Sequence, residues 1–261
     1  MVEIGAEAAP AGVAARCTIV VPCYNEADRL EPRKFAEFLA AERDISFLFV
    51  NDGSRDNTLQ VLESLRRECS PSVEVLNKPV NAGKGEAVRD GMLRAIEVGK
   101  SDFVGFWDAD LATPLEAIPQ LLRELVQKPQ LQMVLGSRIR LLGRQIYRKA
   151  GRHYLGRIFA TVASVMLRLP IYDTQCGAKI FRVTPSLSQM LNEPFVSRWV
   201  FDVELIARFI VLNGHNTAFL HDSIYEFPLY KWEDVAGSKV QPADFLRAFI
   251  DMVKIREKYL R

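Results

Sequence analysis

Residues 103–110 of this chain read Phe-Val-Gly-Phe-Trp-Asp-Ala-Asp, a short apolar run followed at once by two carboxylates. The apolar residues predict a buried strand over Phe103–Trp107. A segment of helical period follows, and Thr113 and Glu116 match the capping box that starts a helix, with a proline at its first position. We therefore expect a helix over Pro114–Gln127 and a strand, loop and helix unit with acidic groups at the carboxyl end of the strand.

Units of this kind repeat along the first half of the chain, because short β-branched or aromatic runs alternate with longer segments of helical period. This alternation predicts an α/β fold with a mostly parallel sheet and crossover helices. One domain is expected over residues 16–261, after a loose Ala-, Gly- and Glu-rich tail over residues 1–15. The further strands are expected at Cys17–Pro22, Ser46–Asn51, Val73–Leu76 and Gln132–Leu135, and the further helices at Glu31–Arg43, Arg55–Glu68 and Lys84–Val98.

The 261 residues include 34 Lys and Arg against 32 Asp and Glu, a formal net charge of +2. Without a global excess of positive charge, nucleic acid is not expected as a partner. The four cysteines form no metal-binding spacing, which favours a reducing, intracellular setting over a disulfide-built fold. No stretch approaches the roughly 18 to 20 apolar residues that span a bilayer, and no secretory leader pattern is evident. We therefore expect a protein that is neither integral to a membrane nor secreted.

Ligands of open α/β sheets bind outside the carboxyl ends of the strands, and a polar motif follows each expected strand. These motifs are P-C-Y-N-E at 22–26, N-D-G-S at 51–54, N-A-G-K-G at 81–85, D-A-D at 108–110 and G-S-R at 136–138. Asp108 and Asp110 repel each other unless a cation lies between them, and Mg²⁺ accepts one or two carboxylates together with substrate phosphates. In the alternative interpretation, one aspartate caps the next helix and the other is solvated.

Two more of these motifs suit a nucleotide. The acceptor-only carboxylate of Asp52 can take a hydrogen bond from a base N–H or a ribose hydroxyl, although D-G-S is also an ordinary turn before a helix. Gly83-Lys84-Gly85 can bring backbone amides and an ammonium to a diphosphate at a helix N-terminus. The segment is not a Walker A loop, and no G-x-G-x-x-G follows the first strand, so a dinucleotide-binding fold is not expected.

The chain resembles the family 2 glycosyltransferases in seven ordered motifs. They are V-P-C-Y-N-E, N-D-G-S, N-A-G-K-G, D-A-D, G-S-R, D-T-Q-C-G-A-K-I-F and R-W-V-F-D-V-E-L. Within that family it is most similar to the dolichyl- or polyprenyl-phosphate β-glucosyltransferase type, over about residues 16–240. The resemblance implies a single α/β domain of GT-A, Rossmann-like fold, with a mostly parallel central sheet and flanking helices. It also implies an inverting hexosyl transfer from a nucleotide sugar, with UDP-glucose as the expected donor.

The resemblance implies donor-side roles for the matching residues. Asp108 and Asp110 are implied to meet Mg²⁺ or Mn²⁺ and the sugar-linked diphosphate, with Asp110 in a catalytic role. A metal clamp with basic residues stabilises the negative charge on the departing nucleoside diphosphate. The implied nucleoside pocket comprises Pro22, Tyr24, Glu26 and Asp52, Lys84 is implied near the uracil or diphosphate, and Asp173, Gln175 and Lys179 near the sugar hydroxyls or diphosphate.

The acceptor side is expected in a basic stretch, because residues 134–172 contain eight Lys or Arg and no Asp or Glu. Apolar residues from Leu155 to Leu169 recur there at helical spacing, which suits an amphipathic helix on an anionic membrane surface and equally an ordinary core helix. In the family that the chain resembles, a helix at this place lies along the bilayer and nearby arginines hold the lipid phosphate. The resemblance therefore implies acceptor-phosphate contacts for Arg138, which is also a catalytic candidate, and for Arg152.

A phosphate acceptor is already ionised at neutral pH, whereas a hydroxyl acceptor needs a general base. Asp202 in W-V-F-D-V-E is the candidate catalytic base. Its alternatives are positioning of the sugar or nucleophile, and a helix N-terminal charge favoured by the macrodipole. Trp232 with Gly237-Ser238-Lys239 also resembles the glucosyltransferase type and is expected to form a mobile segment near the active site, the alternative being an ordinary surface loop.

The expected function is metal-dependent transfer of glucose from UDP-glucose to a polyprenyl or dolichyl phosphate, by a cytoplasmic enzyme with peripheral contact to the membrane face. Three alternatives stay open: transfer to a soluble hydroxyl acceptor, nucleotide-sugar binding without transfer, and nucleotidyl transfer. Binding alone would not require Asp108, Asp110 and Asp202 together. Nucleotidyl transfer is disfavoured because no Gly-rich, basic loop follows the first strand.

Overall fold

The computed structural model describes residues 15–147, 150–235 and 242–260, with the backbone alone at 150–155 and 242–246. Almost all of the expected tail therefore lies outside the described residues, as does the expected mobile segment at Gly237–Lys239. The elements, in chain order, are β1 (Cys17–Cys23), α1 (Pro32–Ala41), β2 (Ile45–Asp52), α2 (Thr58–Glu68), β3 (Val73–Lys78), α3 (Lys84–Val98), β4 (Phe103–Trp107), α4 (Ala117–Gln127), β5 (Met133–Ser137), β6 (Gln145–Tyr147), α5 (Ala150–Leu167), β7 (Ala178–Arg182), α6 (Pro185–Leu191), α7 (Phe201–Leu212), α8 (Thr217–Ser223), β8 (Ile224–Pro228), β9 (Lys231–Glu233) and α9 (Pro242–Tyr259).

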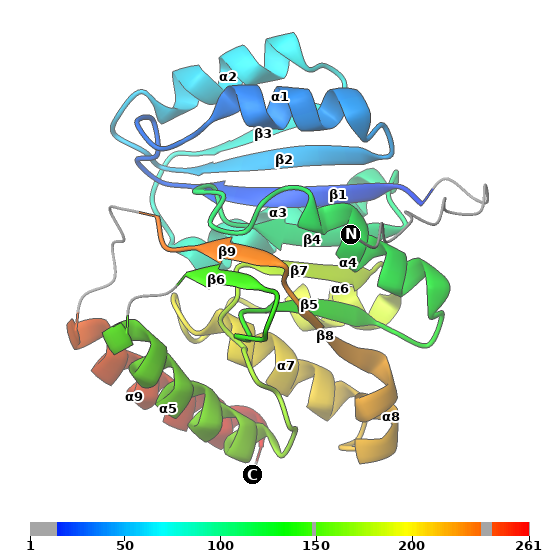
Figure 1. Cartoon of the computed structure of the whole chain (residues 1–261), viewed down its shortest axis with the longest axis vertical. Helices are drawn as coiled ribbons and strands as arrows, with labels where there is room; N and C mark the ends of the chain where they lie inside the picture. Colours follow the sequence, from blue (N-terminus) through cyan, green and yellow to red (C-terminus); the bar gives the residue numbers. More distant parts are fainter. Residues whose placement is uncertain (1–14, 148–149, 236–241, 261) are drawn as a thin grey trace.

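The central sheet has seven strands in the order β3-β2-β1-β4-β7-β5-β8, which can be followed from top to bottom in Figure 1. Strands β3, β2, β1 and β4 are parallel neighbours, and β5 is parallel to β8. Strand β7 runs antiparallel to both of its neighbours, β4 and β5. A separate two-stranded parallel sheet pairs β6 with β9. The predicted α/β fold with a mostly parallel sheet is confirmed, and β7 is the exception to its direction.

Side chains of the central strands alternate between two hydrophobic cores, as the pleat of a strand requires. In β1, Val20 packs into the core that contains residues of α3, α6, α7 and α9. Its neighbours Ile19 and Val21 pack into the other core, with residues of α1, α2 and α4. Both faces of the sheet are thus covered. The carboxyl ends of its parallel strands remain available for a ligand.

The predicted capping box before α4 is wrong. The helix begins at Ala117, and no side chain caps it. Residues 113–116 instead form a turn in which Ala117 donates its N–H to the carbonyl of Pro114. The carbonyl of Thr113 accepts the indole N–H of Trp107 at 2.8 Å, which holds this turn against the preceding strand.

Helix α5 combines the two alternatives that the sequence left open. Phe159, Ala163 and Leu167 on one side are buried in the core. Ile158 and Val165, in contrast, are 56% and 73% exposed. Helix α5 lies beside α9 at the edge of the molecule (Figure 1). None of the helices in the described ranges has the length and apolar character needed to cross a bilayer.

Helix α3 lies close to the sheet at Gly91. A Cβ atom at this position would lie 2.4 Å from Cγ1 of Val20 and 2.8 Å from Cγ2 of Val50. Both valines are fully buried in the middle of parallel strands, and β-branched side chains have few alternative rotamers. The sheet therefore has no room for a side chain at this point of the helix.

We predict that Gly91→Ala destabilises the fold, although the same change in an open helix stabilises it by about 0.5–1 kcal/mol. Overpacking against Val20 should lower the free energy of unfolding by about 1–3 kcal/mol, measured by urea denaturation. In a Val20→Ala background the added methyl has space, so the loss should be smaller. An equal loss in both backgrounds would show that the close approach is not the cause.

Candidate active site

A cavity of about 890 Å³ opens at the carboxyl ends of β1, β2 and β4. Most of the site residues expected from the sequence line it. They come from segments far apart in the chain, which the sheet order brings together. The predicted residues that line the cavity are Pro22, Tyr24, Glu26, Asp52, Lys84, Asp108, Asp110, Arg138, Asp173, Gln175 and Asp202.

One predicted site residue lies elsewhere, and the side chain of a second is not described. Lys179 is only 1% exposed and lies in β7, behind the residues that line the cavity. The side chain of Arg152 lies outside the described residues, so its predicted contact with an acceptor phosphate stays a prediction. Three arginines that the sequence did not single out for this site, Arg29, Arg198 and Arg247, also line the cavity. Arg198 stands inside the R-W-V-F-D-V-E-L motif, a signal that could have identified it.

Asp52 shapes the segment that precedes α3. Its two carboxylate oxygens accept the N–H groups of Ala82 and Gly83 at 3.0 and 2.8 Å. Lys78 lies 3.4 Å from the same carboxylate, which is 2% exposed. Gly83 adopts a φ of 98°, a left-handed conformation that favours glycine. Asp52, at the end of β2, thus holds the backbone that leads into α3, where Lys84 is the first residue.

Asp108 and Asp110 each face a different cation. Lys84 Nζ lies 2.5 Å from Oδ1 of Asp108, and Arg29 Nη2 lies 2.9 Å from Oδ2 of Asp110. Burial and then the neighbouring Asp108 raise the pKa of Asp110 above its usual value. Burial alone would lower the pKa of Lys84, but the carboxylates of Asp108, Asp202 and Asp110 together raise it and the net shift is upward. The site therefore concentrates negative charge that favours a cation.

Gly177 provides the space that the Asp108 carboxylate occupies. A Cβ atom at Gly177 would lie 1.9 Å from Oδ2 of Asp108, and the Asp108 N–H donates to the Gly177 carbonyl at 3.0 Å. The glycine immediately precedes β7, whose antiparallel pairing with β4 sets this register. The direction of β7 thus has a consequence at the site, because it determines where Asp108 can point.

Asp202 is held by a buried cation. Lys179 donates to its carboxylate and to the carbonyl of Cys176. Burial raises the pKa of Asp202, although Lys179 and then Lys84 act in the opposite direction. The ion pair fixes the orientation of Asp202 at the wall of the cavity. Lys179 contributes by compensating that charge from behind.

Arg138 is likewise paired. Its Nε and Nη2 donate to the two oxygens of Asp173 at 2.6 and 2.7 Å, a bidentate arrangement. The guanidinium also lies 5.2 Å from the ring centre of Trp232. Burial alone would lower the pKa of Arg138, but the facing Asp173, together with Cys176 and Asp108, raises it. Arg138 is thus a permanently charged and rigidly oriented group at the cavity.

Two buried polar atoms belong to residues that line the cavity. Gln175 Nε2 and Thr174 Oγ1 are buried, and neither has a hydrogen-bond partner among the described residues. Buried polar groups are normally satisfied, so a ligand with polar atoms suits this wall. Nearby, Arg157 donates to the carbonyl of Tyr172 at 3.0 Å and stacks on its ring. Cations and unsatisfied polar groups together suit a polyanionic ligand.

The donor set at Asp108 and Asp110 fits a divalent cation only in part. In the portion of the chain that is described, no three His, Cys, Asp or Glu side chains gather closely enough to enclose a metal ion. Two neighbouring carboxylates do suit Mg²⁺ or Mn²⁺, which prefer oxygen ligands, and Mg²⁺ commonly completes its coordination with water and substrate phosphates. The residues therefore fit a metal ion that arrives with a nucleotide.

Comparison with known proteins identifies the family. The model of the family "Glycosyl transferase family 2" matches residues 18–186. A dolichyl-phosphate beta-glucosyltransferase of Trichomonas vaginalis is 30% identical over 250 residues, covering 91% of this chain and 70% of that protein. Its Homo sapiens counterpart of the same name is 31% identical, covering 93% of this chain and 75% of that protein.

Solved structures support the fold. Glucosyl-3-phosphoglycerate synthase from Mycobacterium tuberculosis, in complex with Mn²⁺ and UDP-glucose, superposes with a TM-score of 0.66 at 19% sequence identity. The match covers 93% of this chain and 79% of that one. The architecture is the GT-A fold that the sequence motifs predicted. With its family model, its relatives and its strand-end carboxylates in agreement, this chain belongs to glycosyltransferase family 2.

Proposed function

We propose that this protein transfers glucose from UDP-glucose to a polyprenyl or dolichyl phosphate, with inversion, at the cytoplasmic face of a membrane. The observation that carries the proposal is the pair Asp108 and Asp110. Both line the cavity, next to the positively charged side chains of Lys84 and Arg29. The named activity of the curated relatives supports the acceptor. The UDP-glucose in a structure of the same fold is consistent with the donor.

On the donor side, Asp108 and Asp110 would hold Mg²⁺ or Mn²⁺. When bound, the metal would neutralise charge on the diphosphate leaving group. Lys84, at the N-terminus of α3, adds a positive charge beside Asp108. The expected nucleoside pocket includes Pro22 and Tyr24, which line the cavity next to the segment held by Asp52.

On the acceptor side, Arg138 is proposed to contact the phosphate, held in place by Asp173 and Trp232. Arg157 and Arg247 line the same cavity and extend its positive charge toward α5 and α9. An ionised phosphate needs no strong general base. Asp202, oriented by Lys179, then serves to position the sugar or the nucleophile.

Membrane contact is proposed for the outer sides of α5 and α9. Ile158, Val162 and Val165 share one face of α5 at spacings of four and three residues, and all are exposed. Ile250 and Val253 on α9 are exposed as well. An apolar face next to cations suits the surface of an anionic bilayer. A lipid acceptor could then enter the cavity without leaving the membrane.

The first test combines a donor panel with metal removal. Product mass spectrometry with UDP-glucose, UDP-galactose, UDP-N-acetylglucosamine and GDP-mannose, in the presence of polyprenyl phosphate, should show transfer from UDP-glucose.

Chelation, or Asp110→Ala with Mn²⁺ present, should reduce turnover by about 100-fold or more, because charge on the leaving group loses its stabilisation. Asp102→Ala, a change at the opposite end of β4, serves as control. Unchanged turnover in Asp110→Ala would remove the metal from the mechanism, and turnover only on a soluble hydroxyl compound would replace the lipid acceptor.

A second prediction concerns Gly177. We expect Gly177→Ala to force the Asp108 carboxylate out of its position and to weaken Mn²⁺-dependent binding of UDP by about tenfold, equivalent to about 1.4 kcal/mol. Isothermal titration calorimetry measures this affinity. In an Asp108→Ala background the added methyl has no carboxylate to displace, so it should cause no further loss. A similar loss in both backgrounds would contradict the role given to Gly177.

A third prediction concerns the membrane. Val165→Glu places a negative charge on the apolar face of α5, so the fraction bound in flotation with anionic liposomes should fall, by about tenfold in partition coefficient. Val126→Glu, at an exposed valine of α4, is the control and should bind as the original protein does. Hydrolysis of UDP-glucose in the absence of lipid should remain unchanged in both variants. Equal liposome binding by the two variants would argue against α5 as the contact.

A further inference from the structure

The loop between α6 and α7 reaches the donor side of the cavity through Arg198. Nη2 of Arg198 donates to the backbone carbonyl and side-chain oxygen of Asn81, at 3.2 and 2.8 Å, and Nε donates to the carbonyl of Ala82 at 3.1 Å. The neighbouring N–H groups of Ala82 and Gly83 are the ones that Asp52 accepts. Arg198 therefore binds carbonyl groups of this short segment, and Asp52 binds its N–H groups.

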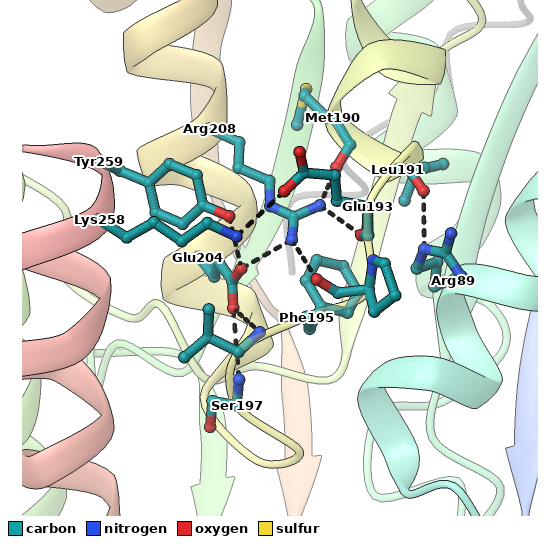
Figure 2. A network of polar contacts seen from close by, with 12 residues as sticks. Arg89, Met190, Leu191, Glu193, Phe195, Ser197, Glu204, Arg208, Lys258 and Tyr259 are labelled. Atoms are coloured by element: carbon teal, nitrogen blue, oxygen red, sulfur yellow. Dashed lines mark hydrogen bonds and ion pairs between the residues drawn. The ribbon is translucent and has the colours of Figure 1, made fainter.

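A buried ion pair on α7 packs against this loop. Glu204 and Arg208 occupy successive turns of α7, are 0% and 5% exposed, and lie 2.7 Å apart (Figure 2). Both side chains are directed at the loop, and together they satisfy four of its backbone groups and one of α6. Glu204 accepts the N–H groups of Val196 and Ser197, and Arg208 donates to the carbonyls of Met190, Glu193 and Pro194.

Helix α9 completes the network from the C-terminal side. The hydroxyl of Tyr259 donates to Glu204 Oε1 at 3.0 Å, and the Arg208 guanidinium lies between the rings of Phe195 and Tyr259, at 4.8 and 5.6 Å from their centres. Asp251, also on α9, accepts the hydroxyl of Ser197 at 2.8 Å. As Figure 2 shows, the loop thus has contacts with α9 and α7, and Arg89 of α3 holds its other end.

We propose that Glu204 and Arg208 are positioning residues for the nucleotide-sugar donor, acting through Arg198, and that α9 sets donor affinity through Tyr259. A buried ion pair is stabilising only when its geometry and its other hydrogen bonds are satisfied, and here the loop backbone provides them. A loop ordered in advance loses less entropy when the donor binds. The inference rests on the proposed function, because it takes the segment next to Asp52 as part of the donor pocket.

The test removes a single hydroxyl. Tyr259→Phe keeps the ring over Arg208 but withdraws one hydrogen bond from Glu204, so the fold should survive. This choice avoids the loss of folding expected when one partner of a buried ion pair is deleted. We expect the Kd for UDP with Mn²⁺, measured by calorimetry, to rise about 3- to 10-fold, with kcat nearly unchanged and KM for the donor raised. Tyr225→Phe, a similar change on β8, should leave the affinity unaltered.

Coupling with Arg198 separates positioning from a general structural effect. If α9 acts through Arg198, Tyr259→Phe should have no further effect on donor affinity once Arg198→Ala is present. An unchanged Kd in Tyr259→Phe, or an equal loss with and without Arg198, would overturn the inference. A protein that binds no nucleotide even before substitution would instead overturn the proposed function.

Discussion

Several carboxylates lie close together at one edge of the sheet in this protein, and nearby cations must offset their mutual repulsion. Three of those that line the cavity are each held by a different cation. The pairs are Asp108 with Lys84, Asp110 with Arg29 and Asp202 with Lys179. Each cation comes from an element other than its acid, so these ion pairs also tie the elements together. Asp108 and Asp110 lie one residue apart, and oxygen ligands of this kind suit a divalent ion that arrives with a diphosphate.

The antiparallel strand β7 is the element that makes this arrangement possible. Parallel strands alone would deliver Asp52 and Asp108 to the edge, but the D-T-Q-C-G-A-K stretch must approach from the opposite direction to face them. Entering β7 from that edge places Gly177 against Asp108 and sends Lys179 behind the cavity. The antiparallel direction of β7 therefore brings the half of the chain that contains Asp52 and Asp108 together with the half that contains Asp202.

Much of the first half of the fold could be predicted because its signals are local. The strand Phe103–Trp107 and the helix Lys84–Val98 have the predicted bounds, and polar residues at strand ends identified the cavity. The partners of the charged groups could not be predicted in this way. Arg138 meets Asp173 across 35 residues, and only the folded sheet shows that this arginine is already paired. The cap expected at Thr113 failed because the residues after it form a turn, and the helix begins only at Ala117.

The two proposals meet in helix α9. One side of this helix holds the loop of Arg198 through Tyr259 and Asp251. Another side exposes Ile250 and Val253, and the helix is in contact with α5. A helix with these two sides links a candidate membrane surface to the segment that borders the donor pocket, and every step of the link is a hydrogen bond or a packed contact. Taken together, the two proposals connect α9 to the segment at Ala82 through Glu204 and the loop that contains Arg198, while its buried side packs into the core that covers the sheet.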